Sequence, residues 1–217
     1  MLVYIYITFI GVAFLSSLIA FRLDFPTHLK LLSLLIGCDL LVELCANFLI
    51  IPLHLRSNVP LYNVTMLLEF WTYGYFFRTI LDNSWLKKAI TYYLILLPVF
   101  WIVVVFFVFG ISHWNSYFAT VGSLFTVCMA IAFYYQLFTA PTLIRLSASP
   151  EFWIAAGLII FYAGNLPYLG MLNFITRNYL ELAKKLLLIL QVLNIIMYSF
   201  FALGYLCSTR TMKLSSR

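Results

Sequence analysis

The chain has 217 residues, of which 65% are hydrophobic, 19% aromatic and only 9% charged. A water-soluble domain would carry roughly a quarter charged residues, so the composition excludes a soluble globular protein and indicates an integral membrane protein. The net charge is +6, and the Lys and Arg residues lie between the apolar runs and form no basic stripe. We therefore expect the lipid bilayer as a partner and no nucleic acid.

Seven apolar stretches are long enough to cross a bilayer as helices. A hydrocarbon core about 30 Å thick takes about 20 helical residues. The sequence therefore predicts an all-α integral membrane protein, a single seven-transmembrane helix bundle over residues 1–217. We expect it to be multi-pass in a cell membrane, the bacterial inner membrane. The predicted helices are residues 2–21, 31–53, 61–81, 89–109, 117–138, 152–174 and 186–207.

Lys and Arg residues are distributed unequally between the two ends of this predicted bundle. Four lie on the side of the N-terminus, namely Arg56, Arg177, Lys184 and Lys185. Nine lie on the side of the C-terminus, namely Arg22, Lys30, Arg78, Lys87, Lys88, Arg145, Arg210, Lys213 and Arg217. The positive-inside rule therefore predicts that the N-terminus is outside and the C-terminus is cytoplasmic.

The second predicted helix contains the sequence CDLLVELCANFLI, which sets two carboxylates and an amide into an apolar run. Asp39, Glu43 and Asn47 are spaced by four residues, so they share one helix face. Exposing an Asp to lipid at the helix centre costs about 2.5 to 3.5 kcal/mol. We therefore expect this face to point into the bundle.

Other predicted helices carry polar groups at a similar depth. Glu69 lies on the third helix, Asn165 on the sixth and Asn194 on the seventh. We therefore expect an outward-open polar cavity that binds a small molecule or an ion. The candidate ligand- or ion-binding residues are Glu43, Asn47, Glu69, Tyr73, Asn165, Gln191, Asn194 and Tyr198. The alternative is that these groups only hydrogen-bond between helices.

Asp39 lies nearer the predicted cytoplasmic side than Glu43 does. Arg78 stands close to the cytoplasmic end of the third helix, which runs antiparallel to the second. A long Arg side chain can extend along apolar surface toward a polar partner. The sequence therefore predicts a structural ion pair between Asp39 and Arg78.

The sixth predicted helix contains YAGNLPYLG, with Gly164 and Pro167 on either side of Asn165 and Leu166. Proline donates no backbone hydrogen bond and frees the carbonyl four residues earlier, so we expect a kink. We interpret Gly164 and Pro167 as a hinge beside the cavity. A static packing kink is the alternative.

Catalytic motifs are mostly missing. We expect His28, His54 and His113 in connections, with His28 on the opposite side of the membrane from the other two, so they cannot form one zinc site. No glycine-rich nucleotide loop, HExxH or GxSxG occurs. We therefore expect no metal, no cofactor and no catalytic residue. Enzyme activity stays open as the less favoured interpretation.

Three stretches carry a resemblance to known membrane proteins: VPLYNVTMLLEFWTYGYFF, EFWIAAGLIIFYAGNLPYL and ILQVLNIIMYSFFALGY. They resemble small seven-helix bacterial inner-membrane proteins, and the layout is similar to the seven-transmembrane sensory regions of histidine kinases. The resemblance implies a sensor-like bundle and supplies no ligand or catalytic residue. The tail after the seventh helix is short, so we expect no kinase or DNA-binding output within the chain.

These observations favour a membrane sensor or accessory subunit. It would bind a small molecule or ion in the outward-facing cavity and signal through a separate membrane or cytoplasmic protein partner. The alternative is a small transporter or channel that uses Glu43 and Glu69 in an ion or proton path. The sequence leaves a homo-oligomer open.

Overall fold

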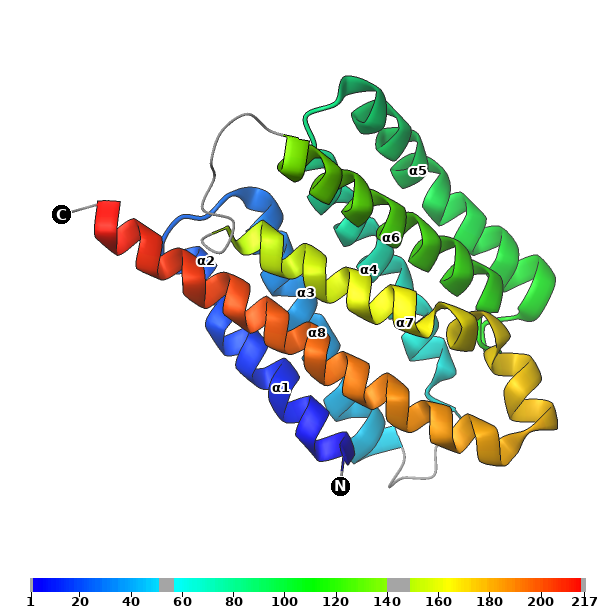
Figure 1. Cartoon of the computed structure of the whole chain (residues 1–217). Coiled ribbons are helices and arrows are strands. Elements are labelled where there is room, and N and C mark those ends of the chain that lie inside the picture. The colour runs from blue at the N-terminus through cyan, green and yellow to red at the C-terminus, as the bar shows by residue number, and fades with distance from the viewer. Residues whose placement is uncertain (1, 51–56, 140–148, 216–217) are drawn as a thin grey trace.

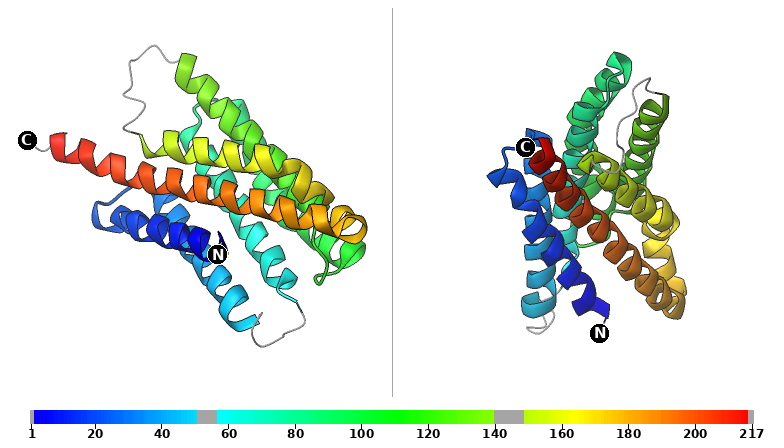
Figure 2. Two further views of the ribbon diagram at one scale, coloured as in Figure 1. Left: turned by 60° about the horizontal axis from the view of Figure 1, so that its bottom comes forward. Right: turned by 60° about the vertical axis from the view of Figure 1, so that its left-hand side comes forward.

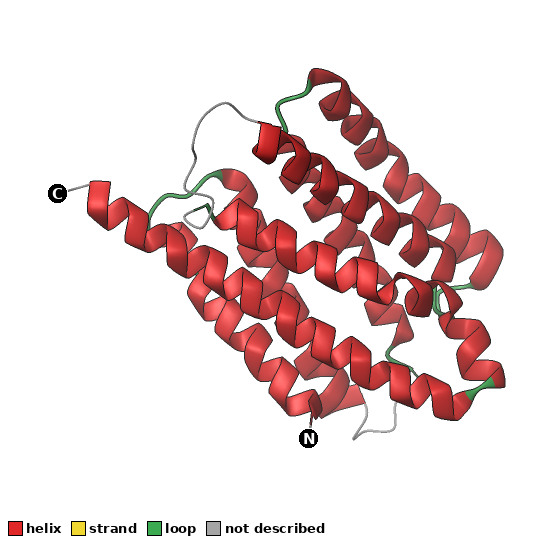
Figure 3. Ribbon diagram, in the orientation of Figure 1, coloured by secondary structure: helices red, strands yellow, loops and turns green. Residues whose placement is uncertain are grey.

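The computed structural model of the chain describes residues 2–50, 57–139 and 149–215, without the side chains of residues 49, 50 and 208–215. Every regular element within these residues is a helix (Figure 3), which confirms the all-α class. The long helices are α1 (Leu2–Ser17), α3 (Thr27–Cys45), α4 (Val59–Ile80), α5 (Ser84–Val103), α6 (Ser116–Thr139), α7 (Pro150–Asn178) and α8 (Leu180–Ser215). The shorter elements are α2 (Ile19–Arg22) and the π-helical turns η1 (Ala46–Ile50) and η2 (Val104–Phe109).

Five helical segments are long and apolar enough to cross a membrane, which supports a multi-pass membrane protein. They are Leu2–Arg22, Ser84–Phe109, Ser116–Thr139, Pro150–Asn178 and Leu180–Cys207. The structure thus supports five of the seven predicted spans. The remaining two long helices, α3 and α4, are interrupted by charged side chains, among them Asp39, Glu43 and Glu69.

Six helices form a ring in the order α1, α3, α4, α6, α7, α8, and α8 closes the ring against α1. The remaining long helix, α5, packs against α4 (Figure 2). The N-terminus, the α5–α6 connection and the α7–α8 turn lie at one end of the bundle (Figure 1). The C-terminus and the α4–α5 connection lie at the other. We call these the N-terminal end and the C-terminal end.

The last predicted connection differs from the structure. We expected a break between residues 174 and 186, but α7 continues to Asn178 and α8 begins at Leu180. Only Tyr179 departs from helical geometry there, and its N–H donates to the Ile175 carbonyl at 2.7 Å. Charged residues ended the predicted span because they mark the edge of the lipid. They do not end a helix, since charged residues are good helix formers.

Part of the predicted charge asymmetry lies outside the described residues. Arg56, Arg145 and Arg217 are outside the described backbone, and the side chains of Arg210 and Lys213 are outside the description. The orientation of the bundle therefore stays a prediction from the sequence.

Helix α7 remains helical through Pro167 and bends in its second half, which contains this proline (Figure 1). The glycines beside it allow close packing of neighbouring helices. A Cβ at Gly164 would stand 2.9 Å from a Leu193 methyl carbon, and one at Gly170 would stand 2.6 Å from the Thr120 hydroxyl. The bend is thus packed against α8 on one side and α6 on the other. Motion at the Gly164–Pro167 hinge stays a prediction.

A fully buried amide holds the α5–α6 connection on the bundle. Asn63 on α4 has no exposed surface, and its Nδ2 donates to the carbonyls of Ile111 and His113 at 2.9 and 2.8 Å. Its Oδ1 accepts from the Asn115 N–H, and its backbone carbonyl accepts from the Trp101 indole. One side chain therefore satisfies three backbone groups of a connection that contains Gly110 in a left-handed conformation (φ 78°).

Replacing Asn63 with alanine should destabilise the protein by about 2 to 4 kcal/mol, because it leaves buried backbone groups without partners. Thermal unfolding of the purified protein, followed by circular dichroism, measures the effect. Asn178→Ala is the matched control, since Asn178 is exposed and its side chain, within the described residues, bonds the Phe174 carbonyl one turn earlier. Equal midpoints for the two variants would contradict the role of Asn63.

Candidate functional site

A cavity of about 140 Å³ lies inside the helix ring. Residues of α1, α3, α4, α7 and α8 line it, together with Trp114 from the α5–α6 connection. Three of the lining residues are acids: Asp39 and Glu43 on α3, and Glu69 on α4. We call this space the acidic cavity. It lies in the half of the bundle toward the N-terminal end, because the first turn of α4 and the α5–α6 connection lie at that end (Figure 1) and supply the lining residues Tyr62 and Trp114.

Glu43 is the acid with the most hydrogen-bond donors. The hydroxyl of Tyr6 on α1 donates to its Oε2, and the Tyr62 hydroxyl donates to its Oε1 at 3.2 Å. The Asn47 amide donates to Oε2 at 3.1 Å and to the Glu43 backbone carbonyl at 2.9 Å. Asn47 lies in η1, so the π-helical turn holds the amide that donates to the carboxylate.

Asp39 is the most buried of the three acids, with 5% of its surface exposed. The hydroxyl of Tyr198 on α8 donates to its Oδ2 at 3.0 Å. Its Oδ1 is buried and has no hydrogen-bond partner among the described residues. A carboxylate can accept about four hydrogen bonds, so Asp39, which lines the acidic cavity, keeps unused acceptor capacity.

Glu69 faces Asp39 and Glu43 from the next helix of the ring. The hydroxyl of Tyr162 on α7 donates to its Oε2 at 3.2 Å. The Tyr162 ring packs against Phe70 and Tyr73, with ring centroids 5.5 and 5.9 Å away. Neighbouring helices thus fix each acid through tyrosine hydroxyls.

The structure brings half of the predicted ligand-binding set to the acidic cavity. Glu43, Glu69, Asn194 and Tyr198 line it, as does Asp39. The other four predicted residues are not among its lining residues: Asn47, Tyr73, Asn165 and Gln191. Asn47 supports Glu43, and Tyr73 lies behind Tyr162 with 1% of its surface exposed.

Asn165 and Gln191 are buried elsewhere in the interior, with 1% and 7% of their surfaces exposed. The Asn165 Nδ2 has no hydrogen-bond partner among the described residues. Kinks and π-helical turns rotate a face away from its ideal position, and the sequence alone does not give that rotation.

The predicted Asp39–Arg78 ion pair is not formed. Arg78 is exposed, and its Nε donates to the hydroxyl of Thr91 on α5 at 2.8 Å. Asp39 is bonded to Tyr198 inside the ring. The prediction was wrong because Arg78 lies on the face of α4 toward α5, whereas Asp39 faces the interior.

Tyr6 and Tyr162 were not predicted as donors to the acids. Tyrosines in membrane proteins are commonly interfacial anchors, and these two were not distinguished as Tyr73 and Tyr198 were. One signal could have found them: buried carboxylates without a cationic partner need neutral donors at their own depth.

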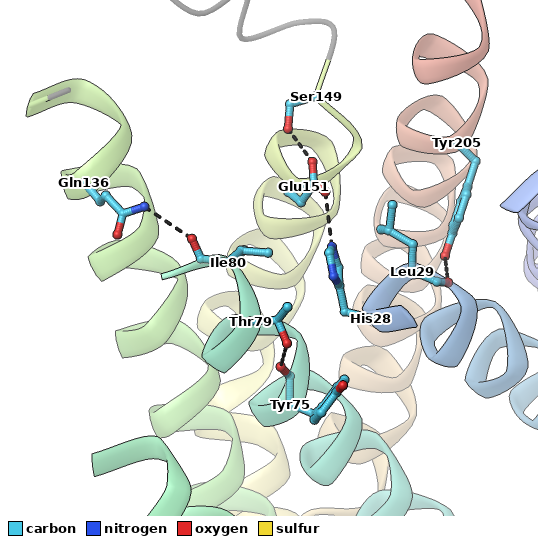
Figure 4. Close-up of polar contacts among 9 residues, drawn as sticks. All are labelled: His28, Leu29, Tyr75, Thr79, Ile80, Gln136, Ser149, Glu151 and Tyr205. Atoms are coloured by element: carbon cyan, nitrogen blue, oxygen red, sulfur yellow. Dashed lines mark hydrogen bonds and ion pairs between the residues drawn. The ribbon is translucent and has the colours of Figure 1, made fainter. Parts of the chain in front are cut away.

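A second polar cluster lies at the C-terminal end (Figure 4). His28 Nε2 lies 3.2 Å from Glu151 Oε1, and the Ser149 hydroxyl donates to Glu151 Oε2 at 2.6 Å. Next to His28, the Leu29 carbonyl accepts from the Tyr205 hydroxyl at 2.7 Å. These contacts connect α3 with α7 and with α8.

One of the two described histidines, His28, lies in a helix instead of the predicted connection. His28 is the second residue of α3 and is buried, with 6% of its surface exposed. His113 lies in the α5–α6 connection as expected, and His54 lies outside the described residues. Within the part of the chain that the structure describes, no group of three His, Cys, Asp or Glu residues could hold a metal ion.

No family model, curated protein or solved structure matches the chain. The resemblance to seven-helix sensory regions therefore stays a prediction, and the function has to be inferred from the geometry of the acidic cavity.

The His28–Glu151 contact should stabilise the bundle by about 1 kcal/mol or more, because it is shielded from water. A double-mutant cycle with His28→Phe and Glu151→Gln measures the coupling from unfolding free energies. The control cycle removes the exposed Lys184–Glu181 pair, joined at 2.7 Å, whose coupling should stay within about 0.5 kcal/mol. Additive effects of the two His28–Glu151 substitutions would contradict the interpretation.

Proposed function

We propose that the protein is a membrane sensor or accessory subunit. A small ligand binds in the acidic cavity and displaces the helices that line it, and a separate membrane or cytoplasmic protein responds to that displacement. The observation that carries the proposal is a cavity shared by five helices, with the carboxylates of Asp39, Glu43 and Glu69 in its wall. An occupant would contact most of the ring at once.

The same helices meet again at the other end of the bundle. Asp39 and Tyr198 join α3 to α8 beside the acidic cavity, and Leu29 and Tyr205 join them again at the C-terminal end. His28 lies eleven residues before Asp39 on α3, a rise of about 16 Å. A helix is stiff over that length, so a shift of α3 at Asp39 is transmitted to the His28–Glu151 contact.

The orientation in this proposal comes from the Lys and Arg distribution. It places the N-terminal end on the outer side of the membrane, with the acidic cavity in the outer half of the bundle, and the C-terminal end on the cytoplasmic side. The His28–Glu151 contact is then on the side where a cytoplasmic partner, or the cytoplasmic end of a membrane partner, would bind.

Packing between the acidic cavity and the C-terminal end favours a sensor over a channel. Toward the C-terminal end, large side chains that expose 0% of their surface fill the interior of the ring: Leu32, Ile36, Phe76, Phe77 and Phe201. A continuous ion or proton path would need polar groups or water at these positions. The buried acids alone would suit a transporter, so the alternative is tested directly.

Proteoliposomes that contain the protein should show no more proton, sodium or potassium flux than protein-free liposomes. The packed apolar side chains between Asp39 and His28 are the reason for this expectation. Ion-sensitive dyes inside the vesicles measure the flux under an imposed gradient. Flux that depends on the protein and disappears in Glu69→Gln would overturn the sensor proposal in favour of the transporter.

Glu43→Ala and Glu69→Ala should abolish the response to small ligands without loss of folded protein. Each substitution removes an acid of the cavity wall. The readout is the shift of the unfolding temperature in a screen of small ions and metabolites. Glu181→Ala is the control, because Glu181 is exposed and its ion pair within the described residues is with Lys184. Wild-type responses in both cavity variants would contradict the proposed binding site.

A further inference from the structure

The lining of the acidic cavity selects for positive charge. Asp39, Glu43 and Glu69 contribute carboxylates, and no Lys, Arg or His is among the lining residues that the structure describes. Tyrosine and asparagine side chains supply hydrogen bonds but no positive charge. An occupant with a cationic group would therefore provide the missing countercharge, whereas an anion would be repelled.

Two of the acids keep acceptor capacity for such an occupant. Glu43 already accepts from Tyr6, Tyr62 and Asn47. Asp39 is 95% buried and accepts only from Tyr198 among the described residues, and Glu69 accepts only from Tyr162 among them. A carboxylate can accept about four hydrogen bonds, so Asp39 and Glu69 are the acids to which a ligand donor would bind.

The spacing of the acids argues against a bare metal ion. Metal sites built from carboxylates need several oxygens at one ion. Among the described residues, no three acidic, His or Cys side chains converge in that way. The acids are instead distributed along the wall, which suits a cation with a body of its own.

The rest of the wall is apolar and largely aromatic. Phe70, Trp114 and Phe161 line the acidic cavity beside Met66 and Met197. Aromatic faces attract organic cations, and they also pack against alkyl groups. The combination of carboxylates and aromatic faces fits a ligand that has both a charged group and a hydrocarbon part.

The size of the cavity gives the size of the ligand. Its volume is about 140 Å³. A single water molecule needs only about 10 to 15 Å³ on this scale, and a cavity of about 150 Å³ in another protein binds benzene. The acidic cavity therefore takes a molecule of about six non-hydrogen atoms.

We propose that the ligand is a small organic ammonium ion of about this size. Its N–H groups donate to the carboxylates of Asp39 and Glu69, and its hydrocarbon part packs against the aromatic wall. This inference rests on the proposed function and names its ligand class. The ammonium group can belong to a free amine or to a lipid headgroup, and the experiment distinguishes the two sources.

The test compares n-pentylammonium with 1-pentanol, which has the same number of non-hydrogen atoms and no charge. Isothermal titration uses the full chain in phosphatidylcholine nanodiscs, because that headgroup has no N–H donor. Pentylammonium should bind at least about tenfold more tightly than pentanol, since hydrogen bonds to a charged group are the stronger ones. Equal binding of the two, or binding of neither at millimolar concentration, overturns the inference.

Asp39→Asn should weaken pentylammonium binding about tenfold or more, and Asp82→Asn should leave it unchanged. Asp82 is an exposed residue between α4 and α5 and does not line the cavity. If Asp39→Asn does not fold, Glu69→Gln replaces it with the same expected direction. Unchanged binding in a folded cavity variant overturns the inference.

Two further arms separate the possible outcomes. Weaker pentylammonium binding in phosphatidylethanolamine nanodiscs would identify the lipid headgroup as the source of the same ammonium chemistry. Hydrogen exchange in the first turns of α3 tests the proposed function by itself. If pentylammonium binds through Asp39 but exchange around His28 does not slow, the ligand class stands and the sensor proposal fails.

Discussion

Three carboxylates inside a membrane bundle are the constraint on which the rest of this structure depends. An acid facing lipid would cost several kcal/mol, and no cationic side chain lines the cavity among the described residues. The protein instead supplies hydroxyl and amide donors from helices around the ring. Tyr6, Tyr62, Tyr162 and Tyr198 each donate to one of the acids. The bonds to Asp39 and Glu43 hold α1, α4 and α8 against α3, and the bond to Glu69 holds α7 against α4.

The two ends of the bundle have different interiors. Toward the N-terminal end lies the acidic cavity, and toward the C-terminal end lie tightly packed aromatic and aliphatic side chains. Beyond that packing, His28 and Glu151 form a second polar contact between helices that also line the cavity. This arrangement is suited to converting occupancy at one end into a change of helix contacts at the other. A through-going path would need the packed half to be polar.

Hydropathy predicted the membrane class and the positions of most helices, because burial in lipid needs long apolar runs. It could not predict the near-continuous α7–α8 hairpin, since the edge of the lipid is not the end of a helix. The acidic stripe of Asp39 and Glu43 was predicted from spacing alone. Its donors were missed because tyrosine has several roles in membranes. The false Asp39–Arg78 pair and the role of Asn63 show the same limit: helix rotation and loop placement depend on distant contacts.

The central claim is that the acidic cavity is open beside Asp39 and Glu69 and receives a ligand. A density map of the full chain in nanodiscs, determined by electron cryomicroscopy, tests it most directly. The account predicts non-protein density, from water or a small molecule, within hydrogen-bond distance of Asp39 or Glu69 between α3, α4 and α8. A cavity filled by packed side chains, or Asp39 and Glu69 facing separate surroundings, would contradict it.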